Sequence, residues 1–168
     1  MNTLSASASS MPSSPGVRIF IPPRIFCICL IGGIAAEFLS PVSFPDVHMV
    51  PWPERLVAGI AIAVAGLAFM LWANNRFVSL GTSVKTCRPA TLLVTKGPYR
   101  FSRNPMYVGF VSILAGIGIA AGSVPMLLSA LPMFLFLSFY VIPREEKYLR
   151  QEFGAEYEAY RRKVRRWL

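Results

Sequence analysis

The stretch TLLVTKGPYRFSRNPMYVG, residues 91–109, lies between two long apolar runs and decides how the chain is organised. Within it Gly97, Pro98 and Pro105 fix turns rather than continue a helix, and basic and aromatic side chains alternate around them. Pro105 can begin a helix, because the first helical positions leave their N–H groups unpaired. We therefore expect a shaped loop, here called the central loop (residues 91–104), that leads directly into an apolar helix.

The composition predicts a membrane protein. Hydrophobic residues make up 54% of the 168 residues and charged residues only 15%, which is too apolar for a water-soluble domain of this size. The net charge of +9 would suit nucleic acid, but the basic residues gather in two blocks beside apolar runs, as in cytoplasmic flanks of membrane helices. We expect a lipid bilayer as the partner, and no nucleic acid. Cys27, Cys29 and Cys87 lack metal-ligand spacing, so we expect no metal and reduced, packed thiols.

Four apolar runs predict an all-α, polytopic integral membrane protein with four transmembrane helices. A hydrocarbon core of roughly 30 Å needs about 20 helical residues, fewer where the flanks reach the headgroups. The runs are residues 24–40, 54–73, 106–121 and 124–142. Only Gly122 and Ser123 separate the last two, so we expect spans three and four to form an antiparallel helical hairpin.

The chain divides into three predicted parts. Residues 1–16 are rich in Ser, Ala and Pro and are predicted to be a disordered tail, without the features of a signal peptide. Residues 17–76 hold the first two transmembrane helices, and residues 77–168 hold the central loop, the hairpin and a last helix. In the second run, Gly59, Gly66 and several alanines form a small-residue face that a neighbouring helix can approach closely.

Lys and Arg residues predict the orientation. Six lie between the second and third runs and eight follow the fourth, whereas the loop between the first two runs has only Arg55. Because basic loops stay in the cytoplasm, both termini are predicted to be cytoplasmic. The central loop and the region after the fourth run then share one face and can build one site together.

The region after the fourth run predicts a C-terminal amphipathic cytoplasmic helix. Pro143 is expected to restart a helix, with Glu145 and Glu146 in its first turn, where the helix dipole favours negative charge. Gly154 is expected to divide this helix into two pieces. An apolar stripe opposite a basic face should lie on the membrane surface; it comprises Leu149, Phe153, Tyr157, Tyr160, Val164 and Trp167.

The residues alone restrict the chemistry without selecting one ligand. The sequence has no Ser-His-Asp set and no phosphate loop, and Gly116 and Gly118 lie inside a span, which excludes a dinucleotide fingerprint. What remains is Tyr99, Tyr107 and the carboxylate pair. Aromatic faces, carboxylates and an apolar wall suit a small zwitterion with a positive centre and an aromatic base. S-adenosylmethionine is one such molecule.

Four ordered motifs resemble a family of membrane enzymes. They are LVTxGPY at residues 93–99, SRNPMYVG at 102–109, EExxL at 145–149 and FGxxYxxY at 153–160. With the apolar hairpin between them, they resemble the C-terminal core of the isoprenylcysteine carboxyl methyltransferase family and its phospholipid N-methyltransferase relatives. The resemblance covers about residues 77–166. It implies an S-adenosylmethionine-dependent methyltransferase in which the central loop and the acidic start of the last helix enclose the cofactor and a tunnel between membrane helices admits a lipidic or prenylated substrate.

The resemblance also implies roles for single residues. Those on the adenosine side would be Leu92, Leu93 and Val94, with Tyr99 in the turn. Those around the methionine and sulfonium would be Asn104, Pro105, Met106 and Tyr107. Glu145 would take the polar end of the cofactor, with Glu146 as the second choice.

Two positions depart from the family pattern, and they leave the acceptor open. The family usually has Arg-His-Pro where this chain has Arg103-Asn104-Pro105, and asparagine cannot titrate near neutrality, so no catalytic base is assigned. Val141 stands where the prenylcysteine enzymes place a substrate-binding arginine, and Arg144, one turn further on, is the candidate substrate residue.

The leading reading is therefore an isoprenylcysteine carboxyl O-methyltransferase-like enzyme, with a phospholipid N-methyltransferase as the alternative. A sterol-reductase-like NADPH enzyme and a small non-enzymatic membrane protein are weaker alternatives. The charge pattern fits a bacterial inner membrane or an endoplasmic reticulum membrane equally well, and the short chain favours the bacterial inner membrane.

Overall fold

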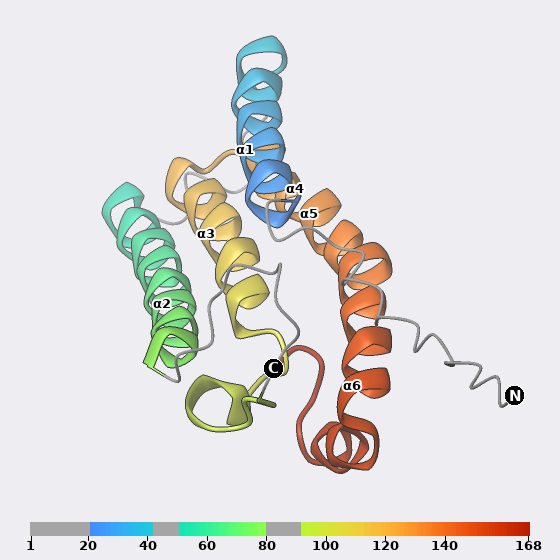
Figure 1. The fold of residues 1–168 in the computed structure, drawn as a ribbon. Coiled ribbons are helices and arrows are strands. Elements are labelled where there is room, and N and C mark those ends of the chain that lie inside the picture. The colour runs from blue at the N-terminus through green and yellow to red at the C-terminus, as the bar shows by residue number, and fades with distance from the viewer. Residues whose placement is uncertain (1–20, 42–50, 80–91) are drawn as a thin grey trace, which may run out of the picture.

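In the computed structural model, which describes residues 21–41, 51–79 and 92–168, every regular element is a helix (Figure 1). This agrees with the all-α prediction. In chain order the helices are α1 (Ile21–Leu39), α2 (Trp52–Ser79), the 3-10 turn η1 (Gly97–Arg100), α3 (Pro105–Ala121), α4 (Val124–Leu128), α5 (Ala130–Phe136), the π-helical turn η2 (Leu137–Val141) and α6 (Ile142–Lys163).

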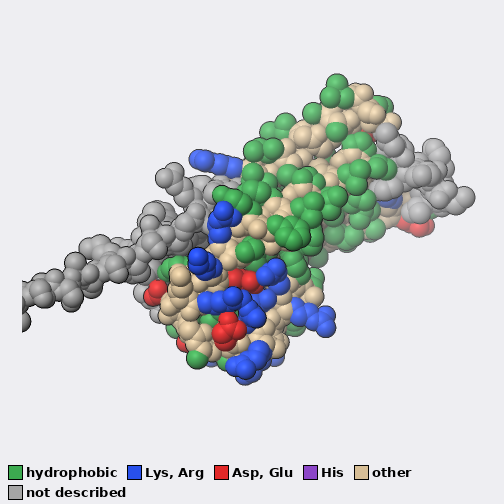
Figure 2. All heavy atoms as spheres, turned by 90° about the vertical axis from the view of Figure 1, so that its right-hand side faces the viewer, with side chains coloured by type: hydrophobic (Ala, Val, Ile, Leu, Met, Phe, Trp, Pro, Cys, Tyr) green, Lys and Arg blue, Asp and Glu red, His purple; other side chains and the backbone are tan. Residues whose placement is uncertain are grey.

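Three helical stretches in the described ranges are long and apolar enough to cross a membrane. They are Pro22–Leu39, Trp52–Arg76 and the run Val124–Lys163. Helix α3 is apolar but shorter, at 17 residues. Figure 2 shows hydrophobic side chains covering the upper body of the molecule, while charged side chains gather at the end formed by α6. The protein is an integral membrane protein, as its composition predicted.

Helices α2 and α3 pack through glycines, which confirms the small-residue face predicted on the second run. A Cβ on Gly59 would lie 2.5 Å from the carbonyl oxygen of Gly116, and a Cβ on Gly109 would lie 2.7 Å from that of Gly66. No side chain fits at these distances, so the two backbones are in direct contact. The pairing order shows that the helices are antiparallel, and it fixes where the start of α3 lies relative to the end of α2.

The chain reverses direction at Gly122 and Ser123. Gly122 has φ 65° and ψ 26°, a left-handed conformation that ends α3, and its N–H donates to the carbonyl of Gly118. Ser123 then caps α4, because its hydroxyl accepts the N–H of Met126 at 3.1 Å. The same hydroxyl donates to the Glu37 carboxylate of α1. Helix α4 packs against both α3 and α1 beyond this turn (Figure 1).

The returning run is interrupted at its prolines. Pro132 has no N–H to offer to the carbonyl of Leu128, and the helix is broken between α4 and α5. Before Pro143, the N–H of Ile142 bonds to the carbonyl of Leu137, five residues back, which makes η2 a π turn. Val141 and Ile142 keep helical backbone angles, so Pro143 does not restart a separate helix as predicted. Glu145 and Glu146 therefore do not lie at a free helix N-terminus, and the helix dipole gives no reason for negative charge at this position.

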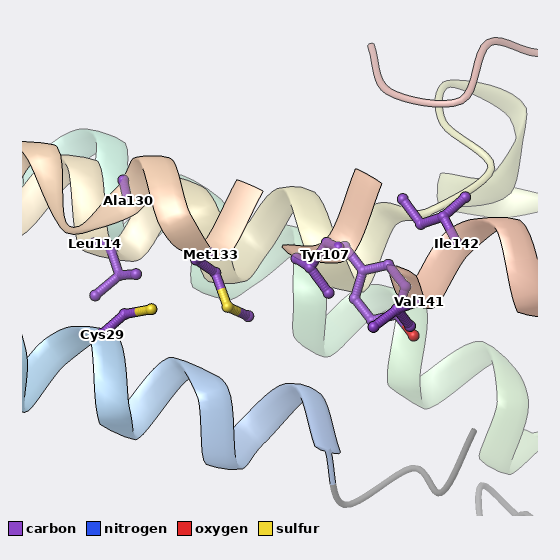
Figure 3. Close-up of a cluster of buried hydrophobic side chains, with 8 residues drawn as sticks. Cys29, Tyr107, Leu114, Ala130, Met133, Val141 and Ile142 are labelled. Carbon is purple, nitrogen blue, oxygen red and sulfur yellow. The ribbon is translucent and has the colours of Figure 1, made fainter. Parts of the chain in front are cut away.

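The first core cluster lies where α1, α3, α5, η2 and α6 meet (Figure 3). Its buried members are Cys29, Tyr107, Leu114, Ala130, Met133, Leu137, Val141 and Ile142. Cys29 is thus packed as predicted, whereas Cys27 is exposed on α1, and Cys87 lies outside the described residues. Tyr107 brings a polar hydroxyl to an otherwise apolar cluster.

The second core cluster joins α2, the central loop and α6. Its buried members are Ala73, Val94, Tyr99, Tyr157 and Tyr160, with Leu149, Phe153 and Val164 packed against them. Most of the predicted apolar stripe therefore packs on the protein, against Val94 and Tyr99 of the central loop. The position of the helix on the membrane surface stays a prediction. The division at Gly154 is confirmed by its non-helical φ of 48° and ψ of −118°.

Candidate functional site

A short hydrogen bond joins the start of α3, directly after the central loop, to the acidic start of α6. The Tyr107 hydroxyl donates to Glu145 Oε1 at 2.6 Å. Tyr107 lies in the first turn of α3, which Pro105 begins, and Glu145 lies in the first turn of α6. This length lies at the short end of the range for O–H···O hydrogen bonds. The structure thus brings together the two residues that sequence reasoning required to meet.

Tyr99 is held beside this pair by the η1 turn. Gly97 has φ 69°, which lets the chain enter the turn, and Pro98 begins it. Tyr99 is buried, and its carbonyl accepts the Tyr160 hydroxyl at 2.8 Å. Burial raises the pKa of Tyr99, and the neighbouring Tyr160 and Glu145 raise it further, so its phenol stays protonated. An aromatic ring and a neutral hydroxyl therefore lie within electrostatic reach of Glu145.

Two arginines, Arg103 and Arg166, form ion pairs with Glu146. Arg103 Nη1 lies 3.0 Å from Glu146 Oε1, and Arg166 Nη2 and Nε lie 2.7 and 3.1 Å from its two oxygens. Arg103 also donates to the Tyr157 hydroxyl at 3.2 Å. The hydrogen bond to Glu146 raises the pKa of Arg166, which stays charged. Glu146 is buried, and both its oxygens accept hydrogen bonds from Arg166.

Asn104, where the family pattern has histidine, bonds to the chain beyond α6. Its side-chain amide donates to the carbonyl of Arg166 at 2.8 Å, and its backbone N–H donates to the Ser102 hydroxyl at 3.0 Å. Its own carbonyl accepts the N–H of Tyr107 at the start of α3. The asparagine therefore fixes backbone geometry, which needs no titratable group.

The apolar candidates divide between buried and exposed positions. Val94 is a buried member of the second core cluster, and Leu93 packs against that cluster. Pro105 is buried, and Met106 packs against both core clusters. These four lie around Tyr99 and Tyr107. Leu92 is about half exposed and is not part of either cluster's buried set.

Arg144 contacts Tyr140 and not the residues around Tyr99 and Tyr107. It is exposed, its guanidinium lies 3.5 Å from the ring centroid of Tyr140, and Nη1 donates to the Tyr140 carbonyl at 3.0 Å. Val141, at the position noted for a family arginine, is fully buried in the first core cluster.

Sequence reasoning missed the polar network around Glu146. Arg103 and Arg166 carry no spacing signal that pairs them with Glu146, since they come from segments on either side of it, and Tyr157 enters the network only through Arg103. Only the fold brings these segments together. In the ranges that the structure describes, no group of three or more His, Cys, Asp or Glu residues could hold a metal ion.

Comparison with known proteins identifies a family to which the chain is similar. A family model described as phospholipid methyltransferase matches residues 54–156, more than half of the sequence. The chain belongs to the phospholipid methyltransferase family. Within this family assignment, the matched region runs from α2 into α6 and contains Tyr107, Glu145 and Glu146, whereas α1 and Arg166 lie outside it. No solved structure matches the chain significantly.

Named relatives match a shorter region. The chain is 45% identical over 74 residues to protein-S-isoprenylcysteine O-methyltransferase of Schizosaccharomyces pombe, covering 44% of this chain and 31% of that protein. It is 41% identical over 73 residues to a probable protein-S-isoprenylcysteine O-methyltransferase of Oryza sativa subsp. indica, covering 43% and 38%. An uncharacterized Haemophilus influenzae protein is 38% identical over 63 residues, all of its length. The matches to the two named methyltransferases thus cover only about a third of their length.

Proposed function

We propose that this protein is an integral membrane methyltransferase that uses S-adenosylmethionine and acts on a lipidic or membrane-embedded acceptor, in the manner of isoprenylcysteine carboxyl O-methyltransferases. Family membership and the names of the relatives support methyl transfer. The observation that carries the proposal is the 2.6 Å bond between Tyr107 and Glu145, because it joins the two segments that must enclose the methyl donor.

The residues around this bond fit the donor's chemistry. The rings of Tyr99 and Tyr107 offer faces to a cation, the Glu145 carboxylate can accept from ammonium or ribose hydroxyls, and Val94 and Met106 offer an apolar wall. S-adenosylmethionine, when bound, supplies a methyl group on a positively charged sulfur. We propose that it is held by Leu92, Leu93, Val94, Tyr99, Asn104, Pro105, Met106, Tyr107 and Glu145, with Glu146 holding the frame and Arg144 reserved for the acceptor.

The chain's part in the reaction is positioning rather than acid or base chemistry. Methyl transfer from a sulfonium releases a neutral leaving group, so orientation and exclusion of water contribute most. The two core clusters on either side of Met106 exclude water from this region. A carboxylate acceptor needs no base. An amine acceptor must first lose a proton, and Glu145 is the recipient that this group of residues provides.

We further propose that the molecule spans the membrane four times, with both termini cytoplasmic, in the inner membrane of a bacterium. Helix α3 packs antiparallel along α2 through backbone contacts at both ends, which supports α3 as a span forming a hairpin with the returning run. The charged end of the molecule then marks the cytoplasmic side. In this arrangement residues 17–76 supply two spans and residues 77–168 form the methyltransferase core. The predicted N-terminal tail, residues 1–16, lies outside the described residues.

Binding measurements in detergent test the donor. Isothermal titration should show that the protein binds S-adenosylmethionine and does not bind NADPH, whereas a sterol-reductase-like enzyme would show the reverse. Alanine at Tyr107 or at Glu145 should abolish donor binding while the protein stays folded. Retained affinity in both folded variants would count decisively against the site.

Labelled methyl transfer tests the acceptor. The family description favours a phospholipid amine as the second candidate, so vesicles with phosphatidylethanolamine should be compared with a prenylated cysteine derivative. Mild base releases label as methanol from a carboxyl methyl ester but not from an N-methyl group. Label that base releases supports the leading proposal, and base-stable label on the phospholipid supports the alternative.

A further inference from the structure

The segment at residues 164–167, here called the strap, is bonded along the central loop. The backbone N–H of Arg103 donates to the carbonyl of Arg165 at 3.0 Å. The Ser102 hydroxyl and the Asn104 amide both reach the carbonyl of Arg166, at 3.3 and 2.8 Å. Three consecutive loop residues therefore hold two consecutive strap carbonyls. Because Asn104 directly precedes α3, the strap is tied to the start of the helix that carries Tyr107.

The strap is also tied to α6. Its Arg166 side chain makes the two-pronged contact with Glu146, the residue next to Glu145. A fork of this kind fixes orientation as well as distance, because the guanidinium and the carboxylate must be coplanar. The strap thus bonds to the loop through its backbone and reaches Glu146 of α6 through the Arg166 side chain.

Packing anchors both ends of the strap. Val164 packs against the second core cluster, and Trp167 packs on the first, with its ring 4.9 Å from that of Phe134. These contacts fix the two ends of the strap on the two core clusters. Apolar packing at both ends and hydrogen bonds between them therefore hold the strap in place.

We propose that Arg166 is a positioning residue for the methyl donor: through Glu146 and the Asn104 contact, the strap sets the spacing of Tyr107 and Glu145. The inference rests on the proposed function, since it is donor binding that this spacing serves. Arg166 touches neither Tyr107 nor Glu145, so it acts through its neighbours. It also lies beyond the region that the family model matches.

The adjacent residues Arg165 and Arg166 provide a variant and its matched control. Arg166→Ala removes the fork to Glu146, whereas Arg165→Ala removes the same charge from an exposed side chain and keeps the carbonyl that Arg103 uses. Arg166→Ala is expected to weaken S-adenosylmethionine binding about tenfold and raise the KM for the donor with little change in kcat, since one charge-assisted contact is lost. Arg165→Ala is expected to stay within about twofold of wild type. Arg166→Lys should recover part of the affinity, because it keeps the charge without the fork.

Hydrogen exchange provides a second readout that needs no donor. In Arg166→Ala the amide of Arg103 should exchange faster than in Arg165→Ala, because the strap loosens from the loop. If the wild type fails to bind S-adenosylmethionine, the proposed function fails, and the exchange comparison still tests the strap. Equal donor affinity, or equal exchange, in the two alanine variants would overturn the proposal. If Arg166→Ala does not fold, Arg166→Gln takes its place and must still exceed Arg165→Ala in both readouts.

Discussion

The two junctions that hold this molecule together use opposite means. Between α2 and α3, Gly59 and Gly66 meet Gly116 and Gly109 with backbone against backbone. At the start of α6, side chains make the junction: Tyr107 of α3 bonds to Glu145, and Arg103 of the central loop and Arg166 of the strap bond to Glu146. The first junction lies among membrane helices and contains no charged side chain in its glycine contacts. The second lies at the charged end of the molecule.

The difference teaches how each junction can be altered. Close glycine contacts allow no adjustment, because any added atom meets backbone, so this junction fixes the scaffold. Charge-assisted bonds are directional but can lengthen or exchange partners, so the second junction can admit a ligand between its parts. A rigid scaffold with an adjustable polar junction is suited to binding a small charged molecule at a membrane surface.

The largest expected effect comes from filling the glycine junction. In Gly116→Leu the new Cβ would lie 2.6 Å from the Gly59 carbonyl oxygen and 2.7 Å from the backbone nitrogen of Ala63. Because both are backbone atoms that cannot move aside, we expect a loss of about 3 kcal/mol or more of folding stability. Thermal unfolding in detergent measures this. Gly32→Leu, on α1 with no atom within 4 Å of its Cβ, is the control and should melt like the wild type. Equal melting of both variants would show that the helices do not pack as described.

The second-largest effect is expected at the polar junction, where Tyr107 meets Glu145. Tyr107→Phe keeps the ring and removes the hydroxyl that donates to Glu145. A hydrogen bond contributes about 0.5 to 1.5 kcal/mol between neutral groups and about 1.5 to 3 kcal/mol to a charged one, so affinity for S-adenosylmethionine should fall about threefold to a hundredfold. Titration calorimetry reads this directly. Tyr140→Phe, which alters an exposed tyrosine on the π turn, is the matched control. An unchanged dissociation constant in Tyr107→Phe would separate this bond from donor binding.

A smaller effect is expected at the bend of α6. Gly154 has φ 48°, and a Cβ there would meet no atom within 4 Å, so Gly154→Ala adds backbone strain without a steric clash. The cost should be about 1 to 2 kcal/mol, seen as a lower denaturation midpoint. Gly32→Ala, at an equally open but helical position, should raise stability slightly. A stable Gly154→Ala protein would mean that the bend is not needed to pack the second core cluster.

The smallest effect is expected at Arg144. Its contact with the Tyr140 ring is exposed, so Arg144→Ala should cost no more than about 0.5 to 1 kcal/mol of stability and leave donor affinity unchanged. Equilibrium unfolding and donor titration test these expectations. A raised KM for the acceptor in the same variant would support its proposed role in substrate binding, and an unchanged KM would remove that role.

The same contrast explains what could be predicted from the sequence. The apolar runs and the glycine face of α2 were readable because helical spacing repeats along one segment, and the structure agrees at Gly59 and Gly66. The meeting of Tyr107 with Glu145 followed from charge counting and from the family resemblance.

The contacts of Glu146 could not be read, because Arg103 and Arg166 come from segments that only the fold brings together. The protein contacts that cover the α6 stripe could not be predicted for the same reason. An apolar face shows that something covers it, and it does not show whether lipid or protein does. Here the central loop provides the cover, through Val94 and Tyr99.

The π turn at Leu137–Val141 has a consequence for the angular setting of the acidic pair. In an α-helix each residue advances the chain by about 100°, so one extra residue in a turn rotates everything that follows by about that angle. Without it, Glu145 would be aimed about a quarter of a revolution away from Tyr107. The phase of the last helix is thus set by an irregularity several residues upstream, within the membrane run.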